Sequence, residues 1–179
     1  MKFIKWLREL SKNDLSLVGG KAANLGEMYN AALPVPQAFV VTVDAYKEFL
    51  KRTKLKRRIL QILRETDFNN PSNLEENTRK IRELIENAKM PEEIEKEIVE
   101  AYEQLSREFE KDEEYVAVRS SATAEDVKEA SFAVQQLSLL NVKGKDSVLK
   151  AVQKCWASLF TARATFYRHQ KGFKHEKVY

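Results

Sequence analysis

Apolar side chains recur at helical spacing through the middle of the chain. Spacings of three and four place such side chains on one face of a helix. A shorter amphipathic segment at residues 44–53 precedes the main stripes, so the pattern predicts a helical block over residues 44–112. The residues that form the stripes are Ile59, Ile62, Leu63, Leu74, Ile81, Leu84, Ala88, Ile94, Ile98, Ala101, Leu105 and Phe109.

Local signals predict where several of these helices begin. Thr42 is placed to cap the helix that starts at Asp44. Ser72 and Glu75 have the spacing of a capping box. Pro91 fits the first turn of a further helix.

Short apolar runs on either side of the block predict strands. Residues 38–43 and 115–118 are Val-rich runs typical of buried strands, and part of residues 132–142 predicts another. Residues 3–10 fit a short amphipathic helix or an extended arm. The order of elements predicts an α+β or α/β fold, with a small mixed sheet flanked by helices and the block at 44–112 inserted as a helical subdomain.

Two more helices complete the predicted fold. One covers residues 21–32, directly after Gly19 and Gly20, and a long one runs from residue 146 to about 172. The long helix carries Cys155 on a wide apolar face, which predicts a buried, unreactive thiol.

Composition and charge narrow the class of protein. The chain has 179 residues, of which 43% are hydrophobic and 32% charged, so a disordered protein is excluded. One Cys and two His exclude a disulfide framework and a thiolate or histidine metal centre. The net charge is +4, with cations concentrated in residues 51–64 and acids in residues 92–114. We interpret these segments as two solvated helix faces and expect no nucleic-acid partner.

No apolar run reaches the ~20 residues that cross a bilayer. Charges also interrupt the apolar start of the chain, unlike a signal peptide. We therefore expect a cytoplasmic protein with no membrane partner.

The Gly19 and Gly20 pair is the first candidate for chemistry. Backbone N–H groups at the start of a helix bind anions. An anion there would also offset the unfavourable position of Lys21 at the positive end of the helix dipole. The spacing is not that of a Walker A loop. The alternative is a turn with an exposed lysine, which these residues alone favour.

Arg119 and the small polar residues after it form the second candidate. A predicted buried strand ends at Arg119, and ligands bind at the carboxyl ends of strands in α/β sheets. Arginine suits bidentate contact with phosphate. Ser120, Ser121 and Thr123 add hydroxyl donors.

The alternative for Arg119 is an ion pair with Glu125 or Asp126, and the residues alone favour neither interpretation. A polyphosphate is a natural ligand for two basic residues beside small-residue loops. We expect Lys21 and Arg119 to lie within reach of one anion.

Five motifs, in order along the chain, resemble the N-terminus of phosphoenolpyruvate synthases. They are LVGGKAANLGEM, LPVPQAFVVT, VAVRSSATAEDVKEASFAVQQ, LNV and CWASLFTARATFYR. Pyruvate phosphate dikinase and rifampicin phosphotransferase have related N-termini that look less similar. The resemblance implies that residues 1–179 are part of one nucleotide-binding domain, the N-terminal lobe of an ATP-grasp fold.

The resemblance also implies an activity. In that family this domain passes the β-phosphoryl group of ATP to a histidine on a second domain, and a third domain phosphorylates pyruvate. The net reaction converts ATP, pyruvate and water to AMP, phosphoenolpyruvate and phosphate, with magnesium. The family's phosphate-contacting Lys and Arg correspond to Lys21 and Arg119. The full set of expected nucleotide contacts is Lys21, Arg119, Ser120, Ser121, Thr123, Gln136 and Ser138.

The sequence departs from the family pattern in two respects. Val134 stands where the family has a lid glycine, and Leu137 where it has an acid. Valine does not readily take the backbone conformations open to glycine. The sequence therefore does not predict the flexible lid that the family has over the ATP phosphates. The chain also stops at Tyr179, before the family's adenine-binding segment and magnesium ligands, and neither His169 nor His175 matches the phosphoacceptor.

We therefore expect magnesium ligands, the phosphohistidine domain and the pyruvate-binding domain to lie outside this chain, and no turnover by the chain alone. The main hypothesis is the N-terminal ATP-binding portion of a phosphoenolpyruvate synthase. The alternatives are a non-catalytic or redesigned fragment with a vestigial nucleotide site, or part of a rifampicin phosphotransferase-type antibiotic kinase. An exposed sheet edge would favour a homodimer.

Overall fold

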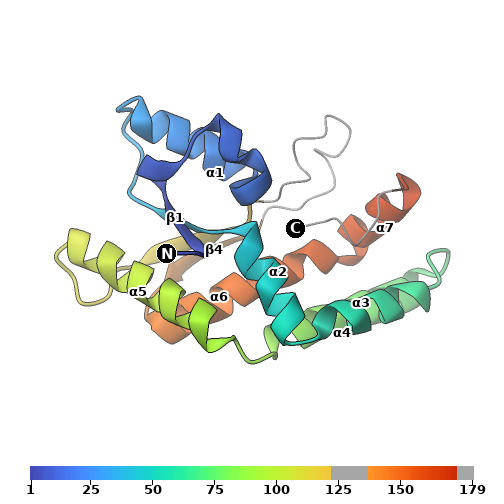
Figure 1. Cartoon of the computed structure of the whole chain (residues 1–179). Coiled ribbons are helices and arrows are strands. Elements are labelled where there is room, and N and C mark those ends of the chain that lie inside the picture. Colours follow the sequence, from blue (N-terminus) through green and yellow to red (C-terminus); the bar gives the residue numbers. More distant parts are fainter. Residues whose placement is uncertain (122–136, 173–179) are drawn as a thin grey trace.

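The computed structural model describes residues 1–121 and 137–172 (Figure 1). The fold mixes α and β structure and is mostly helical. Its main elements are β1 (Ile4–Trp6), α1 (Leu15–Asn30), β2 (Phe39–Val41), α2 (Val43–Arg52), α3 (Leu55–Arg64), α4 (Pro71–Glu86), α5 (Glu92–Glu108), β3 (Val116–Arg119), β4 (Ser138–Val142), α6 (Lys145–Ala157) and α7 (Ala162–Gln170). Short 3-10 helices lie at Leu7–Glu9, Lys12–Asp14 and Ser158–Phe160.

The strands of the described residues form two antiparallel pairs and not one mixed sheet. β1 pairs with β2, and β3 pairs with β4 through an irregularity between Val116 and Val118. The expected extended arm at residues 3–10 supplies β1 and then a 3-10 turn. β2 is half-buried along its length, so it is less enclosed than its apolar sequence predicts.

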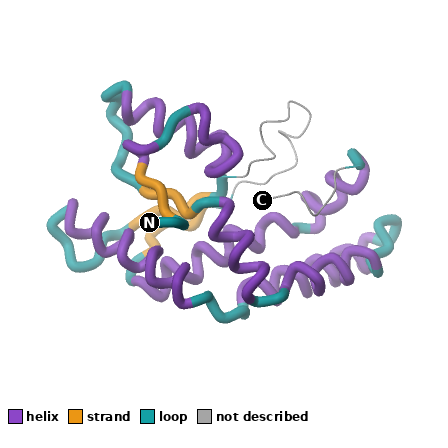
Figure 2. Tube along the Cα trace, viewed as in Figure 1, coloured by secondary structure: helices purple, strands orange, loops and turns teal. Residues whose placement is uncertain are grey.

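The strands gather near the centre of the molecule, with α1 on one side and α5 and α6 on the other (Figure 2). The main hydrophobic core joins α2–α6 to β1 and includes the fully buried Phe49, Ile98 and Tyr102. A second, smaller core lies under α1. Its buried members are Leu7, Leu10, Val18, Ala22 and Ala23.

The predicted helical block is confirmed as α2, α3, α4 and α5. The apolar stripes face the core, with Ile81, Ile94 and Ile98 all 0% exposed. Phe109 is the exception, because it follows the last residue of α5 and is 44% exposed. Pairs such as Arg79 with Glu83, at 2.9 Å, lie on the solvent side. The block shares its core with α6. Its status as an insertion within one nucleotide-binding domain stays a prediction.

The three predicted helix starts need correction in detail. Asn70 caps α4, because its side-chain oxygen accepts hydrogen bonds from the backbone N–H groups of Ser72 and Asn73 at 3.1 and 3.2 Å. The predicted capping box is therefore wrong, since Ser72 lies inside the first turn. Thr42 does precede α2, but its hydroxyl makes no capping bond. Pro91 is the residue just before α5.

The predicted long helix is wrong, because it breaks between α6 and α7. Thr161 is extended, with φ −67° and ψ 150°, and its side chain caps α7. The Ser158 hydroxyl donates to the Cys155 carbonyl at 2.6 Å, and Arg82 donates to the Phe160 carbonyl at 2.9 Å. Side chains thus bond carbonyls at the break. Helix α6 buries mainly apolar residues, whereas the buried residues of α7 are Ala164, Thr165 and Arg168.

Within the described residues, no helix has both the length and the hydrophobicity that crossing a membrane requires.

Candidate functional site

Helix α1 is interrupted at Gly19, as the glycine pair predicts. Gly19 has φ 76° and ψ 164°, outside the helical region, while Gly20 is already helical. A positive φ is readily available only to glycine. The segment from residue 20 to residue 30 therefore begins as a new helix, with the half-buried Lys21 in its first turn.

The end of β3 lies against this kink, so the two candidate loops meet. Lys21 Nζ donates a hydrogen bond to the Ser120 carbonyl oxygen at 3.2 Å, although the two residues are 99 positions apart. We call residues 18–22 and 119–121 the α1–β3 junction. The junction places Lys21 beside the residue that follows Arg119.

Ser121 makes the closest contacts with the kink. Its hydroxyl donates to the Val18 carbonyl at 2.8 Å and accepts from the Ala22 N–H at 3.3 Å. A Cβ atom on Gly19 would lie 2.6 Å from Ser121 Oγ and 2.8 Å from its carbonyl oxygen. The close approach of the two segments therefore requires glycine at position 19.

Arg119 and Ser120 are held by the pairing of β3 with β4. Arg119 is exposed and lies opposite Ser138, which is also exposed. Beyond the strand, the Ser120 N–H donates to the Leu137 carbonyl at 3.0 Å, and Ser120 Oγ accepts from the Leu137 N–H at 3.1 Å. Because β3 is antiparallel and half-buried, the rule for carboxyl ends of parallel strands does not explain this site. The hydrogen bonds between α1 and the two serines that follow β3, Ser120 and Ser121, explain it instead.

The charged residues of the α1–β3 junction, Lys21 and Arg119, are both cationic. Burial raises the pKa of the nearby Cys155 thiol from 9.0 to about 11, and the charge of Lys21 opposes that rise. The half-buried thiol therefore stays protonated near neutral pH, in agreement with the predicted unreactive cysteine. The junction offers ammonium, guanidinium and helix N-terminal groups, which are donors for an anion.

Several expected site residues lie outside the described residues. Thr123 and Gln136 are among them, as are Val134 and the alternative partners of Arg119, Glu125 and Asp126. Lys21, Ser120 and Ser121 are brought together by the structure, with Arg119 and Ser138 at the adjacent strand ends. The sequence pattern missed the direct bonds from Ser121 to α1, since no local signal pairs residues about 100 positions apart.

Within residues 1–121 and 137–172, no three His, Cys, Asp or Glu side chains gather where they could hold a metal ion. Magnesium prefers oxygen ligands such as carboxylates. The cationic junction suits phosphate oxygens instead.

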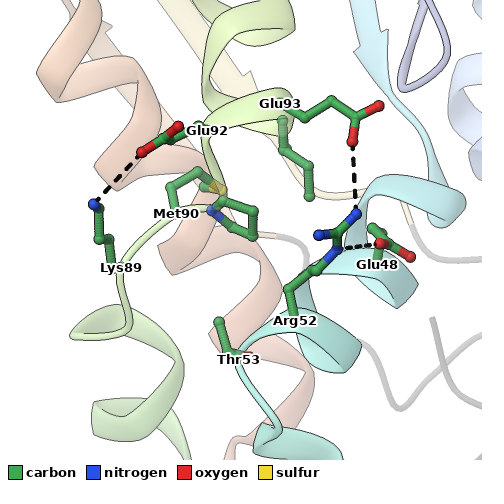
Figure 3. Close-up of a pocket in the computed structure, with 9 residues that line it drawn as sticks. Glu48, Arg52, Thr53, Lys89, Met90, Glu92 and Glu93 are labelled. Atoms are coloured by element: carbon green, nitrogen blue, oxygen red, sulfur yellow. Dashed lines mark hydrogen bonds and ion pairs between the residues drawn. The ribbon is translucent and has the colours of Figure 1, made fainter.

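A surface hollow of about 480 Å³ lies between α2 and the start of α5, away from the junction (Figure 3). Arg52 crosses it, with Nε 2.6 Å from Glu48 and Nη2 4.0 Å from Glu93. Lys89 and Glu92 form a further pair at 4.0 Å on its rim. Such exposed ion pairs contribute little energy, so the α1–β3 junction is the better candidate site.

Comparison with known proteins places the chain in a family. The chain matches the family described as the pyruvate phosphate dikinase, AMP/ATP-binding domain over residues 15–179, and it belongs to that family.

Curated relatives narrow the comparison to phosphoenolpyruvate synthases. The chain is 57% identical to a probable phosphoenolpyruvate synthase of Methanocaldococcus jannaschii, over 99% of this chain and 15% of that protein. It is 49% identical to the phosphoenolpyruvate synthase of Pyrococcus furiosus, over 99% of this chain and 26% of that protein. It is 43% identical to the phosphoenolpyruvate synthase of Helicobacter pylori, over 99% of this chain and 22% of that protein. The predicted resemblance is confirmed, and the chain spans between 15% and 26% of the length of these relatives.

Proposed function

We propose that this chain is the ATP-binding part of a phosphoenolpyruvate synthase, and that Lys21 and Arg119 hold the phosphates of ATP. One observation carries the assignment of the site. Lys21 bonds the Ser120 carbonyl at 3.2 Å, so two basic residues from distant parts of the chain lie at one junction. The family match to an AMP/ATP-binding domain supports the ligand class.

The chemistry of the junction suits a polyphosphate. The helix that begins at residue 20 has its positive dipole end at this junction, which favours an anion there. Arg119 is exposed at the end of β3, and a guanidinium suits bidentate contact with phosphate oxygens. In the proposed reaction, both cations offset the negative charge that shifts as the phosphoryl group leaves.

The proposed whole reaction is that of the relatives' family. ATP, pyruvate and water give AMP, phosphoenolpyruvate and phosphate through a phosphohistidine on another domain. Magnesium, which neutralises phosphate charge in such reactions, would be held by residues other than those described here. An ATP-grasp architecture, a cytoplasmic location, a homodimer and contacts with the phosphohistidine and pyruvate-binding domains stay predictions.

Calorimetric titration of MgATP into the full chain tests this proposal. We expect binding in the unmodified chain and at least tenfold weaker binding in Arg119→Ala and in Lys21→Ala. Arg58→Ala is the matched control, because it removes one exposed positive charge from α3, outside the junction. No heat at millimolar ATP would instead support the non-catalytic module. Equal affinities in all four proteins would place the nucleotide elsewhere.

A further inference from the structure

One turn of α1 is closed by a side chain from another part of the molecule. In an unbroken helix, the N–H of Ala22 would bond to the carbonyl of Val18, four residues earlier. The conformation of Gly19 opens that turn. The Ser121 hydroxyl bonds to both groups, accepting from Ala22 at 3.3 Å and donating to Val18 at 2.8 Å.

The kink has a shape that admits this hydroxyl. Residues 18–20 are buried, and the space where a Gly19 side chain would begin is filled by Ser121 Oγ and the Ser121 backbone. Gly19 therefore both interrupts the helix and makes space at the break. Its missing side chain leaves room for Ser121 to enter the break.

The bonds of Ser121 also limit what else it can do. A serine hydroxyl has one O–H donor. That donor is directed to the Val18 carbonyl, whereas phosphate oxygens are acceptors that need donors. While the turn is closed in this way, Ser121 has no proton to offer a phosphate.

We propose that Ser121 is a positioning residue and not a phosphate ligand: its hydroxyl completes the broken turn of α1 and so holds Lys21 against the end of β3. Lys21 directly precedes Ala22, whose N–H is fixed by Ser121, and Lys21 Nζ is bonded to Ser120. The catalytic relevance rests on the proposed function, in which Lys21 contacts ATP. The positioning of Lys21 itself does not depend on ATP.

Ser120 provides a matched control next to Ser121 in the chain. Its hydroxyl accepts from the Leu137 N–H at 3.1 Å and so supports the pairing of β3 with β4. It makes no contact with the Ala22 N–H, which is bonded to Ser121. The two serines are thus expected to protect different backbone amides.

Amide hydrogen exchange, measured by NMR without nucleotide, tests the first half of the proposal. In Ser121→Ala, the Ala22 amide should exchange at least tenfold faster, while the Leu137 amide keeps its rate. In Ser120→Ala, the Leu137 amide should exchange at least tenfold faster, while the Ala22 amide keeps its rate. Core amides of α4 and α5 serve as the folding reference, and rates are compared relative to them. An Ala22 rate that is unchanged in Ser121→Ala, or that changes equally in both variants, overturns the proposal.

Chemical reactivity of Lys21 tests the second half. Mass spectrometry after brief treatment with an acylating ester should show Lys21 modified several-fold faster in Ser121→Ala, with Lys56 on α3 as an exposed reference. Ser121→Thr, which keeps the hydroxyl, should restore the slow rate. A faster Ala22 exchange with unchanged Lys21 reactivity would make Ser121 a purely structural residue and overturn the positioning role.

MgATP titration of the same variants separates this inference from the proposed function. If the unmodified chain binds ATP, Ser121→Ala should bind several-fold more weakly and Ser121→Thr nearly as well as the unmodified chain. Equal affinity in Ser121→Ala would overturn the positioning role. If the unmodified chain binds no ATP, the proposed function fails for this chain, and amide exchange and Lys21 reactivity still decide the role of Ser121.

Discussion

The helical block and the α1–β3 junction are held together in different ways. The block of α2–α5 buries wide apolar stripes in the main core, where residues such as Ile81 and Ile98 are 0% exposed. The junction consists mainly of small residues around Lys21 and Arg119, and individual hydrogen bonds join residues about 100 positions apart. A typical hydrogen bond contributes only about 1 kcal/mol. Stability therefore resides mainly in the block, and the geometry of the candidate site resides in the junction.

The largest expected effect tests the block. Ile98→Ala should lower the free energy of unfolding by about 2–5 kcal/mol, because it leaves a cavity in the core. Urea unfolding measures the loss. Lys96→Ala, on the same helix but with a side chain 75% exposed, should change stability by less than about 0.5 kcal/mol. Similar losses in both variants would contradict the difference drawn between core and surface.

The next effect tests the junction. Gly19→Ala should cost about 1–3 kcal/mol from its positive φ, and its Cβ would also collide with the backbone of Ser121. We expect ATP binding to be lost as well. Gly172→Ala is the control, since Gly172 has φ 68° but nothing within 4 Å of an added Cβ. If urea unfolding and calorimetry gave equal results for the two variants, the contact with Ser121 would have no special importance.

A buried amide sharpens the comparison, because the core of the block also contains long-range polar bonds such as those of Gln153. Gln153 of α6 donates to the carbonyls of Ile85 and Ala88 at 2.9 and 2.8 Å, at the end of α4. Gln153→Leu should lower stability by about 1–3 kcal/mol by leaving these carbonyls unsatisfied. Gln104→Leu removes only an exposed 3.4 Å bond to Glu108 and should be nearly neutral in the same unfolding assay. A neutral Gln153→Leu would show that the bonds of Gln153 are dispensable.

The smallest effect is a pH dependence at Cys155. The thiol has a pKa of about 11 in the folded chain against 9.0 ordinarily, because burial disfavours the thiolate. The unfolded chain therefore loses this proton first, so stability should fall as pH rises from about 9 to 11. The loss should be about 1 kcal/mol at pH 10. Cys155→Ala should lack this component when unfolding is followed against pH, and identical pH profiles would contradict it.

Sequence predicts the block better than the junction for a physical reason. Helical periodicity is local, so α2–α5 could be located from their own residues. Caps and breaks depend on competition between neighbours. Asn70, two residues before Ser72, accepts hydrogen bonds from the N–H groups of Ser72 and Asn73, and this places Ser72 inside the first turn of α4. The break before α7 depends on Thr161 and on an arginine from α4, which periodicity does not detect.

The sequence predicts the individual residues of the candidate site but not the contacts that bring them together. Glycine conformation and phosphate chemistry single out Lys21 and Arg119, each within its own loop. The resemblance to a known family links them through a common ligand. The insertion of Ser121 into α1 arises only from tertiary packing, since the same serine would otherwise be assigned to phosphate binding.

The most direct test of the account is a titration of the full chain with MgATP, followed by the backbone amide shifts in NMR spectra. We predict that the amides of residues 19–22 and 119–121 shift together and saturate at one ATP concentration. The amides of α3, α4 and α5 should stay in place. Shifts confined to the hollow between α2 and α5, or no shifts at millimolar ATP, would contradict the assignment of the nucleotide site to the α1–β3 junction.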